Sequence, residues 1–135
     1  MLEITAAGMR FVARWEDGLA PKTVAAFKGI LPLDDRIIHC RWSGESNWIP
    51  WGDREFGIGA ENATSYPHPG ELALYPGGQS ETELLMPYGY CNFASKAGPL
   101  AGNHFATIVE GLDQLPELGR LTLWQGAQAI SFREG

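Results

Sequence analysis

The 135-residue sequence has few positive charges and no long apolar run. It contains ten lysines and arginines against sixteen aspartates and glutamates, which gives a net charge of −6, and the cations form no cluster. Binding to nucleic acid or to a membrane surface relies on a positive surface, so we expect neither partner. No apolar run approaches the roughly 20 residues that span a bilayer.

Cysteine is scarce as well, and the sequence has no secretory signal. Cys40 and Cys91 stand in unlike surroundings, so we expect free thiols, as in a reducing compartment, rather than a disulfide. The N-terminus lacks the basic stretch and apolar core that mark an exported chain. These features together predict a cytoplasmic protein.

Patterns for metals, phosphates and cofactors are also missing. The three histidines, His39, His68 and His104, lie far apart and show none of the close spacings of metal ligands. A metal site built from Glu61, His68 and His104 is the alternative. Residues 75–78 (Tyr-Pro-Gly-Gly) read as a turn, because no lysine and no helix follow as in a phosphate-binding loop. We therefore predict no metal and no cofactor.

Glycine and proline, in contrast, are plentiful, at seventeen and nine residues. They divide the chain at short intervals, which is typical of many strands and turns. Apolar alternation predicts strands over residues 2–6, 9–15, 36–43, 46–51, 71–75, 83–86, 103–109, 121–124 and 129–132.

One helix is predicted over residues 21–31, where Pro21 suits the first turn and an apolar stripe follows. A short helical turn over residues 112–118 is closed by Gly119. The fold prediction is one mainly β domain over residues 1–135. It is a closed barrel of about eight strands with one covering helix.

Three segments, in order along the chain, resemble cyclophilins. Residues 18–31 resemble the helix that follows the first cyclophilin hairpin (A-P-K-T-V-x-N-F). Residues 69–74 resemble a cyclophilin G-P-G-x-L-S-M segment, and residues 102–111 resemble G-K-H-V-V-F-G-x-V-x-E-G. The Trp-Ser-Gly-Glu at 42–45 and the turn at 75–78 are more similar to a short, mostly uncharacterised bacterial branch of that superfamily. The resemblance implies a cyclophilin-like barrel.

The prolyl isomerase pattern of true cyclophilins is absent. Neither Gln-Gly-Gly-Asp nor Gln-Phe-Phe occurs, so Arg36 is not carried over as an isomerase residue. Isomerase activity is therefore the least expected function. The resemblance instead implies amide chemistry, because such barrels recur in bacterial ATP-dependent hydrolases of ureas and cyclic amides. That implication rests on the fold alone.

Two polar segments, residues 61–71 and 88–104, are the candidate site. Glu61 and His104 are predicted as a catalytic acid–base pair, because a carboxylate and an imidazole with different pKa values can share a proton-transfer role. The alternative is structural, with a solvated Glu61 and a His104 that satisfies local backbone groups. The predicted ligand-binding side chains are Asn62, Tyr66, Tyr88, Asn92, Ser95 and Trp48.

The predicted function is binding of a small molecule, with hydrolysis of a small amide-like or cyclic polar metabolite. The alternative is a non-catalytic ligand-binding or assembly module. Cys91 is either a nucleophile or, more simply, a small buried thiol. Residues 48–51 (Trp-Ile-Pro-Trp) carry more apolar surface than a small monomer normally exposes, which predicts a homodimer.

Overall fold

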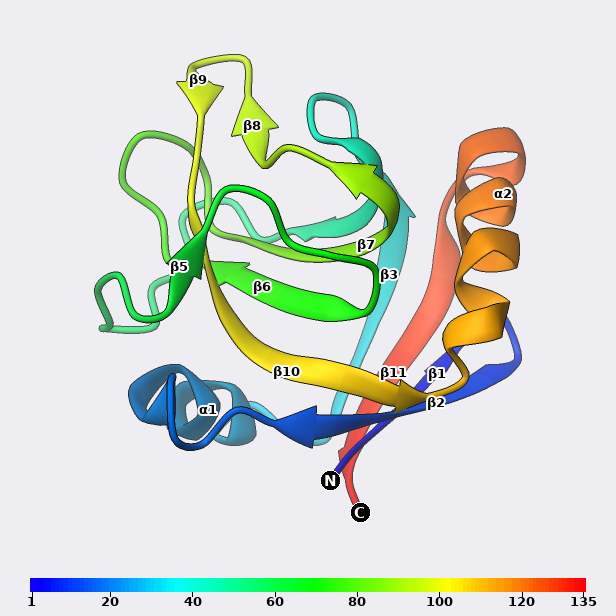
Figure 1. Ribbon diagram of the computed structural model, residues 1–135, viewed down its shortest axis with the longest axis horizontal. Coiled ribbons are helices and arrows are strands. Elements are labelled where there is room, and N and C mark those ends of the chain that lie inside the picture. Colours follow the sequence, from blue (N-terminus) through cyan, green and yellow to red (C-terminus); the bar gives the residue numbers. More distant parts are fainter.

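Eight antiparallel strands close into a barrel in the computed structural model, which describes residues 1–135 (Figure 1). The strand order is β2-β1-β11-β3-β4-β7-β6-β10, and pairing of β10 with β2 closes the ring. The prediction of a closed, mainly β barrel is confirmed. The bounds are β1 (Leu2–Ala6), β2 (Met9–Trp15), β3 (Leu33–His39), β4 (Gly44–Pro50), β6 (Glu71–Tyr75), β7 (Glu83–Cys91), β10 (Gly102–Glu110) and β11 (Gln128–Glu134).

Three short strands lie outside the ring. β5 (Ala63–Thr64) pairs with the start of β10, and β8 (Ala94–Ser95) pairs with β9 (Gly98–Pro99) as a separate hairpin. Figure 1 shows this hairpin projecting beyond the end of β7. These three short strands belong to, or directly adjoin, the polar segments 61–71 and 88–104, and they attach those segments to the barrel wall.

The helix α1 (Pro21–Lys28) ends three residues before the predicted boundary at Leu31. Its apolar stripe packs into the barrel, and Phe27 of this stripe is fully buried. The Phe27 ring centroid lies 4.8 Å from that of Phe105 in β10 and 5.4 Å from that of Phe132 in β11. The predicted covering role of this helix therefore corresponds to a specific aromatic contact.

The second helical region is longer than predicted. A 3-10 turn, η1 (Leu112–Gln114), leads into α2 (Leu115–Gln125), so the helical turn expected over 112–118 continues to residue 125. The strand predicted over 121–124 is wrong. Gly119 does not close the helix but lies within it, where the Tyr88 ring occupies the space of a side chain. Leu115, Leu118 and Thr122 are buried at helical spacing, which overrides the local alternation.

Two of the predicted strands differ most from the structure in their bounds. The strand predicted over 36–43 is β3, which begins and ends earlier, and the strand predicted over 83–86 is β7, which continues to Cys91. No helix of the structure is long and apolar enough to cross a membrane.

Buried side chains form two clusters on opposite sides of the barrel wall. The larger fills the interior and includes Ile49 of β4 and Leu84 of β7. Their strand neighbours Trp48 and Leu85 belong to the smaller cluster, because successive side chains of a strand point to opposite faces. Phe93 and Leu100, which flank the β8–β9 hairpin, complete that outer cluster. The hairpin segment therefore covers an outer face of the wall.

Candidate functional site

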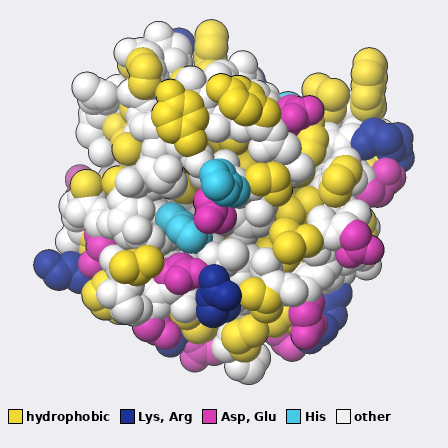
Figure 2. All heavy atoms as spheres, viewed as in Figure 1, with side chains coloured by type: hydrophobic (Ala, Val, Ile, Leu, Met, Phe, Trp, Pro, Cys, Tyr) yellow, Lys and Arg dark blue, Asp and Glu magenta, His cyan; other side chains and the backbone are white.

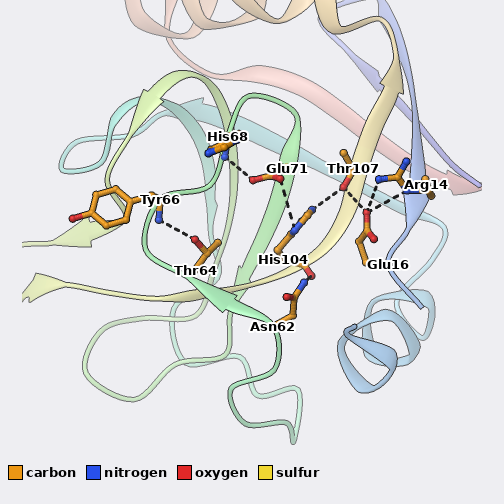
Figure 3. Close-up of polar contacts among 9 residues, drawn as sticks. All are labelled: Arg14, Glu16, Asn62, Thr64, Tyr66, His68, Glu71, His104 and Thr107. Atoms are coloured by element: carbon orange, nitrogen blue, oxygen red, sulfur yellow. Dashed lines mark hydrogen bonds and ion pairs between the residues drawn. The ribbon is translucent and has the colours of Figure 1, made fainter. Parts of the chain in front are cut away.

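His104 lies in a chain of polar contacts that joins β10 to β2 and β6 (Figure 3). Its Nε2 is 2.7 Å from the Thr107 hydroxyl, which donates to Glu16 Oε2 at 2.6 Å. On the other side of the ring, Nδ1 is 4.0 Å from Glu71 Oε2. Arg14 donates to Glu16 at 3.0 Å. Figure 2 shows histidine and acidic side chains gathered at the centre of this face.

The direction of these hydrogen bonds limits what His104 can do. The Thr107 hydrogen bond lowers the pKa of Glu16 most; burial opposes it and Arg14 adds to it, so the net pKa is below the usual value. An ionised Glu16 only accepts, so the Thr107 proton points toward it and His104 Nε2–H donates to Thr107. Thr107 is therefore not activated as a nucleophile. This series of polar contacts links β2, β6 and β10.

Glu61 contacts the start of α1 rather than His104. Its Oε1 accepts from the Thr23 backbone N–H and from the Thr23 hydroxyl, each at 2.8 Å, and Lys22 N–H donates to Oε2 at 3.3 Å. A carboxylate suits a helix N-terminus, where backbone N–H groups lack partners. Burial acts to raise the pKa of Glu61, but these hydrogen bonds lower it overall. The structure does not bring the Glu61 and His104 side chains together as a pair.

Asn62 connects the same loop to β10 through the backbone. Its side-chain amide donates to the His104 carbonyl at 2.8 Å, and its own carbonyl accepts from His104 N–H at 3.2 Å. Asn62 has a φ of 50°, in the left-handed region that asparagine tolerates better than most residues. The side-chain amide N–H and the backbone carbonyl of Asn62 thus hold the loop to β10.

The other predicted ligand-binding residues lie in different places. Tyr66 is 58% exposed and lines a shallow groove with His68 and Tyr90. The Tyr88 hydroxyl is 2.8 Å from His39 Nε2, beneath α2. Asn92 donates its backbone N–H to Ser43. Only the last two residues of the set, Ser95 and Trp48, line one cavity.

That cavity has a volume of about 220 Å³ and lies over β4 and β7, beside the β8–β9 hairpin. Its floor is formed by the buried residues Ser43, Trp48 and Glu83, and its exposed rim carries both signs of charge. The full lining is Cys40, Arg41, Trp42, Ser43, Trp48, Ser80, Glu81, Glu83, Ala94, Ser95 and Lys96. We call it the Trp48–Glu83 cavity.

Glu83 is the most unusual group in this cavity. It is only 4% exposed, and no protein group donates a hydrogen bond to its carboxyl oxygens. Burial, and secondly the charge of Glu81, raise its pKa to about 8. Its carboxyl group is therefore largely protonated at neutral pH, when it both donates and accepts hydrogen bonds.

Trp48, which also lines the cavity, carries a buried polar group without a partner. Its indole N–H is the one buried side-chain polar atom in the protein without a hydrogen-bond partner. Leaving such a donor unpaired costs about 1–3 kcal/mol, so nearly all buried donors in folded proteins are paired. Two residues that line one cavity thus each carry a polar group without a hydrogen-bond partner in the protein.

Sequence reasoning missed Glu83, as well as Arg41 and Lys96 at the rim. One local signal was present, because Glu83 is the single charge at the start of an apolar run (Glu-Leu-Leu-Met at 83–86). It lies on the same face of β7 as Leu85, which packs in the outer cluster. A carboxyl group on a buried face acquires a strongly shifted pKa, and groups with such pKa values are concentrated at functional sites.

Metal and thiol chemistry receive no support from the arrangement. No group of three or more His, Cys, Asp or Glu side chains is placed to hold a metal ion, so Glu61, His68 and His104 are not assembled as one. Cys40 and Cys91 are both free. Burial, followed by the influence of Cys40, raises the pKa of Cys91 to about 12, which keeps this thiol protonated and unreactive.

The architecture defines a cyclophilin-like barrel, a fold also found in the structure of McbB in complex with tryptophan. The two superpose with a TM-score of 0.76 at 19% sequence identity, which shows a shared fold. The match covers 99% of this chain and 44% of the McbB chain, so the present chain spans less than half the length of that neighbour.

The particular family is shown by sequence. A family model described as "Protein of unknown function (DUF3830)" matches residues 2–134, so the chain belongs to the DUF3830 family. Among curated proteins, none matches the sequence.

Proposed function

We propose that this protein binds a small polar molecule in the Trp48–Glu83 cavity. The observation that carries the proposal is Glu83, a residue only 4% exposed whose carboxyl group lines the cavity and has no hydrogen-bond partner within the protein. Burial of an unpaired carboxyl group costs stability. Such costs are commonly retained where function needs them, and a bound ligand would supply the missing partner.

The size of the cavity supports a metabolite rather than a peptide. Its 220 Å³ is about seven times the volume that one water occupies in the liquid. That is below the range of about 300–1,000 Å³ typical of pockets for drug-sized ligands. McbB, which shares the fold, was solved in complex with tryptophan, so a small ligand is compatible with this type of barrel.

Hydrolysis of a small amide-like or cyclic polar metabolite is the second candidate function. It is favoured by Glu83, whose pKa of about 8 suits proton transfer near neutral pH. Glu61 and His104, the acid–base pair expected from sequence, do not support it, because their polar atoms contact α1 and Thr107 instead. We therefore place non-catalytic binding first and prolyl isomerisation last.

A homodimer and a cytoplasmic location also remain proposals. Two of the four apolar residues that suggested a dimer are used inside the protomer, since Trp48 is 9% and Ile49 1% exposed, whereas Pro50 is exposed. Support for a dimer comes instead from apolar side chains left exposed elsewhere, of which Trp124 of α2, at 77%, is the largest.

The binding proposal can be tested with a library of small polar metabolites, screened by thermal shift. Each hit is then titrated into ¹⁵N-labelled protein while the indole N–H signals of the five tryptophans are followed. Trp48→Phe identifies the Trp48 signal, and Trp124→Phe, at an exposed position on α2, is the matched control.

We expect hits that shift the Trp48 signal and lose affinity at least tenfold in Trp48→Phe but not in Trp124→Phe. The proposal is overturned if no compound stabilises the protein, or if all hits leave the Trp48 signal unmoved.

A further inference from the structure

Two cations at the rim of the Trp48–Glu83 cavity lack a carboxylate partner. Five of the ten lysines and arginines form ion pairs, but Arg41 and Lys96 are in none of them. Arg41 follows β3, and Lys96 lies in the turn of the β8–β9 hairpin, so two distant segments bring positive charge to one cavity. The rim holds one carboxylate, Glu81, against these two cations, so its net positive charge favours an anionic ligand group.

The floor of the cavity, where Glu83 lies, is complementary to a different chemical group of the ligand from the one that fits the rim. A protonated carboxyl presents a donor O–H beside an acceptor C=O. An amide presents the complementary edge, with its C=O accepting and its N–H donating, so the two can form a pair of hydrogen bonds. An ionised Glu83 could only accept and would repel an anion at the rim. The remaining titratable groups of the lining are Glu81 at the rim and the Cys40 thiol.

We infer that the ligand of the Trp48–Glu83 cavity is a small amido acid, with its carboxylate at Arg41 and Lys96 and its amide at Glu83. This inference rests on the proposed binding function of the same cavity. It excludes two neighbouring ligand classes. A neutral amide leaves the two cations unpaired, and a simple carboxylate leaves the Glu83 floor unpaired.

The binding experiment uses three small probes of similar size. N-acetylglycine carries both an amide and a carboxylate, N-acetylglycinamide carries only amides, and propionate carries only the carboxylate. Each is titrated at pH 6.5 while the Trp48 indole signal is followed. We expect N-acetylglycine to bind at least tenfold more tightly than either of the others.

Variants separate the contributions of rim and floor. The double substitution Arg41→Ser with Lys96→Ser should weaken N-acetylglycine at least tenfold and leave N-acetylglycinamide unchanged. Arg36→Ser, at an exposed cation outside the cavity, should change neither. Glu83→Gln keeps a donor and an acceptor, so it should retain binding and remove the loss of affinity that we expect of the natural protein above pH 8.

The outcomes distinguish the amido-acid inference from the proposed binding function on which it rests. The amido-acid inference is overturned if N-acetylglycinamide or propionate binds as tightly as N-acetylglycine. It is also overturned if N-acetylglycine binds the Arg41→Ser, Lys96→Ser double variant as tightly as the natural protein. The inference also fails if none of the three probes moves the Trp48 signal while a library compound does, and the binding function then stands. If neither probes nor library move that signal, both fail.

Discussion

Replacing Glu83 with glutamine should make the protein more stable, and increasingly so as the pH rises. The pKa of Glu83 is raised from 4.5 to about 8 by burial and by Glu81. Between these two values the unfolded chain has an ionised carboxylate at this position, whereas the folded protein must hold a proton there. The folded state then binds more protons than the unfolded state, so stability falls as the pH rises from about 5 to about 8. Glutamine keeps the shape and has no charge to lose.

The size of the effect follows from the two pKa values. Each pH unit between them costs the natural protein about 1.4 kcal/mol relative to a group that does not titrate. At pH 7 the pH lies 2.5 units above the unfolded value of 4.5, so the cost is about 3 kcal/mol. Below pH 4.5 the cost vanishes, and above pH 8 it reaches a plateau near ~5 kcal/mol.

Urea unfolding followed by tryptophan fluorescence at pH 5, 6, 7 and 8 measures this difference. The stability gained by Glu83→Gln should grow by about 3 kcal/mol from pH 5 to pH 8. Glu55→Gln makes the same change at an exposed carboxylate and is the matched control. A gain for Glu83→Gln that is constant with pH, or a loss of stability at pH 8, would refute the reasoning that Glu83 is buried without a partner.

Four further predictions concern the rest of the molecule. Glu61→Gln should lower the melting temperature, because a charged cap at the α1 N-terminus is lost. It should leave the ligand affinity, measured from the Trp48 indole signal, unchanged, and a loss of binding in a fully folded variant would restore Glu61 as a site residue. Thr107→Val should destabilise by about 1–2 kcal/mol in urea unfolding, since Glu16 loses a hydrogen bond, whereas Thr107→Ser should be near neutral; equal effects would show that the hydroxyl does not matter. In a protease-coupled peptide assay we expect no prolyl isomerase turnover on the scale of true cyclophilins, and such turnover would contradict the sequence argument. Sedimentation should show a dimer at micromolar concentration that Trp124→Ser weakens, and a monomer of 14.8 kDa alone would count against it.

The barrel and its first helix were readable from the sequence because their signals are local. Alternation over residues 2–6 and 9–15, with a turn at Ala7-Gly8, defines a hairpin without knowledge of the rest of the chain. Both turn residues have positive φ, at 50° and 80°, as a tight hairpin requires. Pro21 and the stripe through Phe27 set α1 in the same way. The strand prediction over residues 121–124 was wrong because a segment of four residues fits the strand period and the helix period equally well.

The site depended on contacts between distant parts of the chain. Sequence identified residues 61–71 and 88–104 as polar, but the Glu61 side chain binds Thr23, 38 positions away, instead of His104. Similarly, only the closed barrel brings Arg41 and Lys96 to one cavity. The burial that gives Glu83 its high pKa comes from tertiary packing around β7. Local periodicity therefore determined the strands and α1 of this protein. Tertiary packing decided which polar side chains are satisfied and which are left for a ligand, because hydrogen-bond partners and desolvation depend on distance in space.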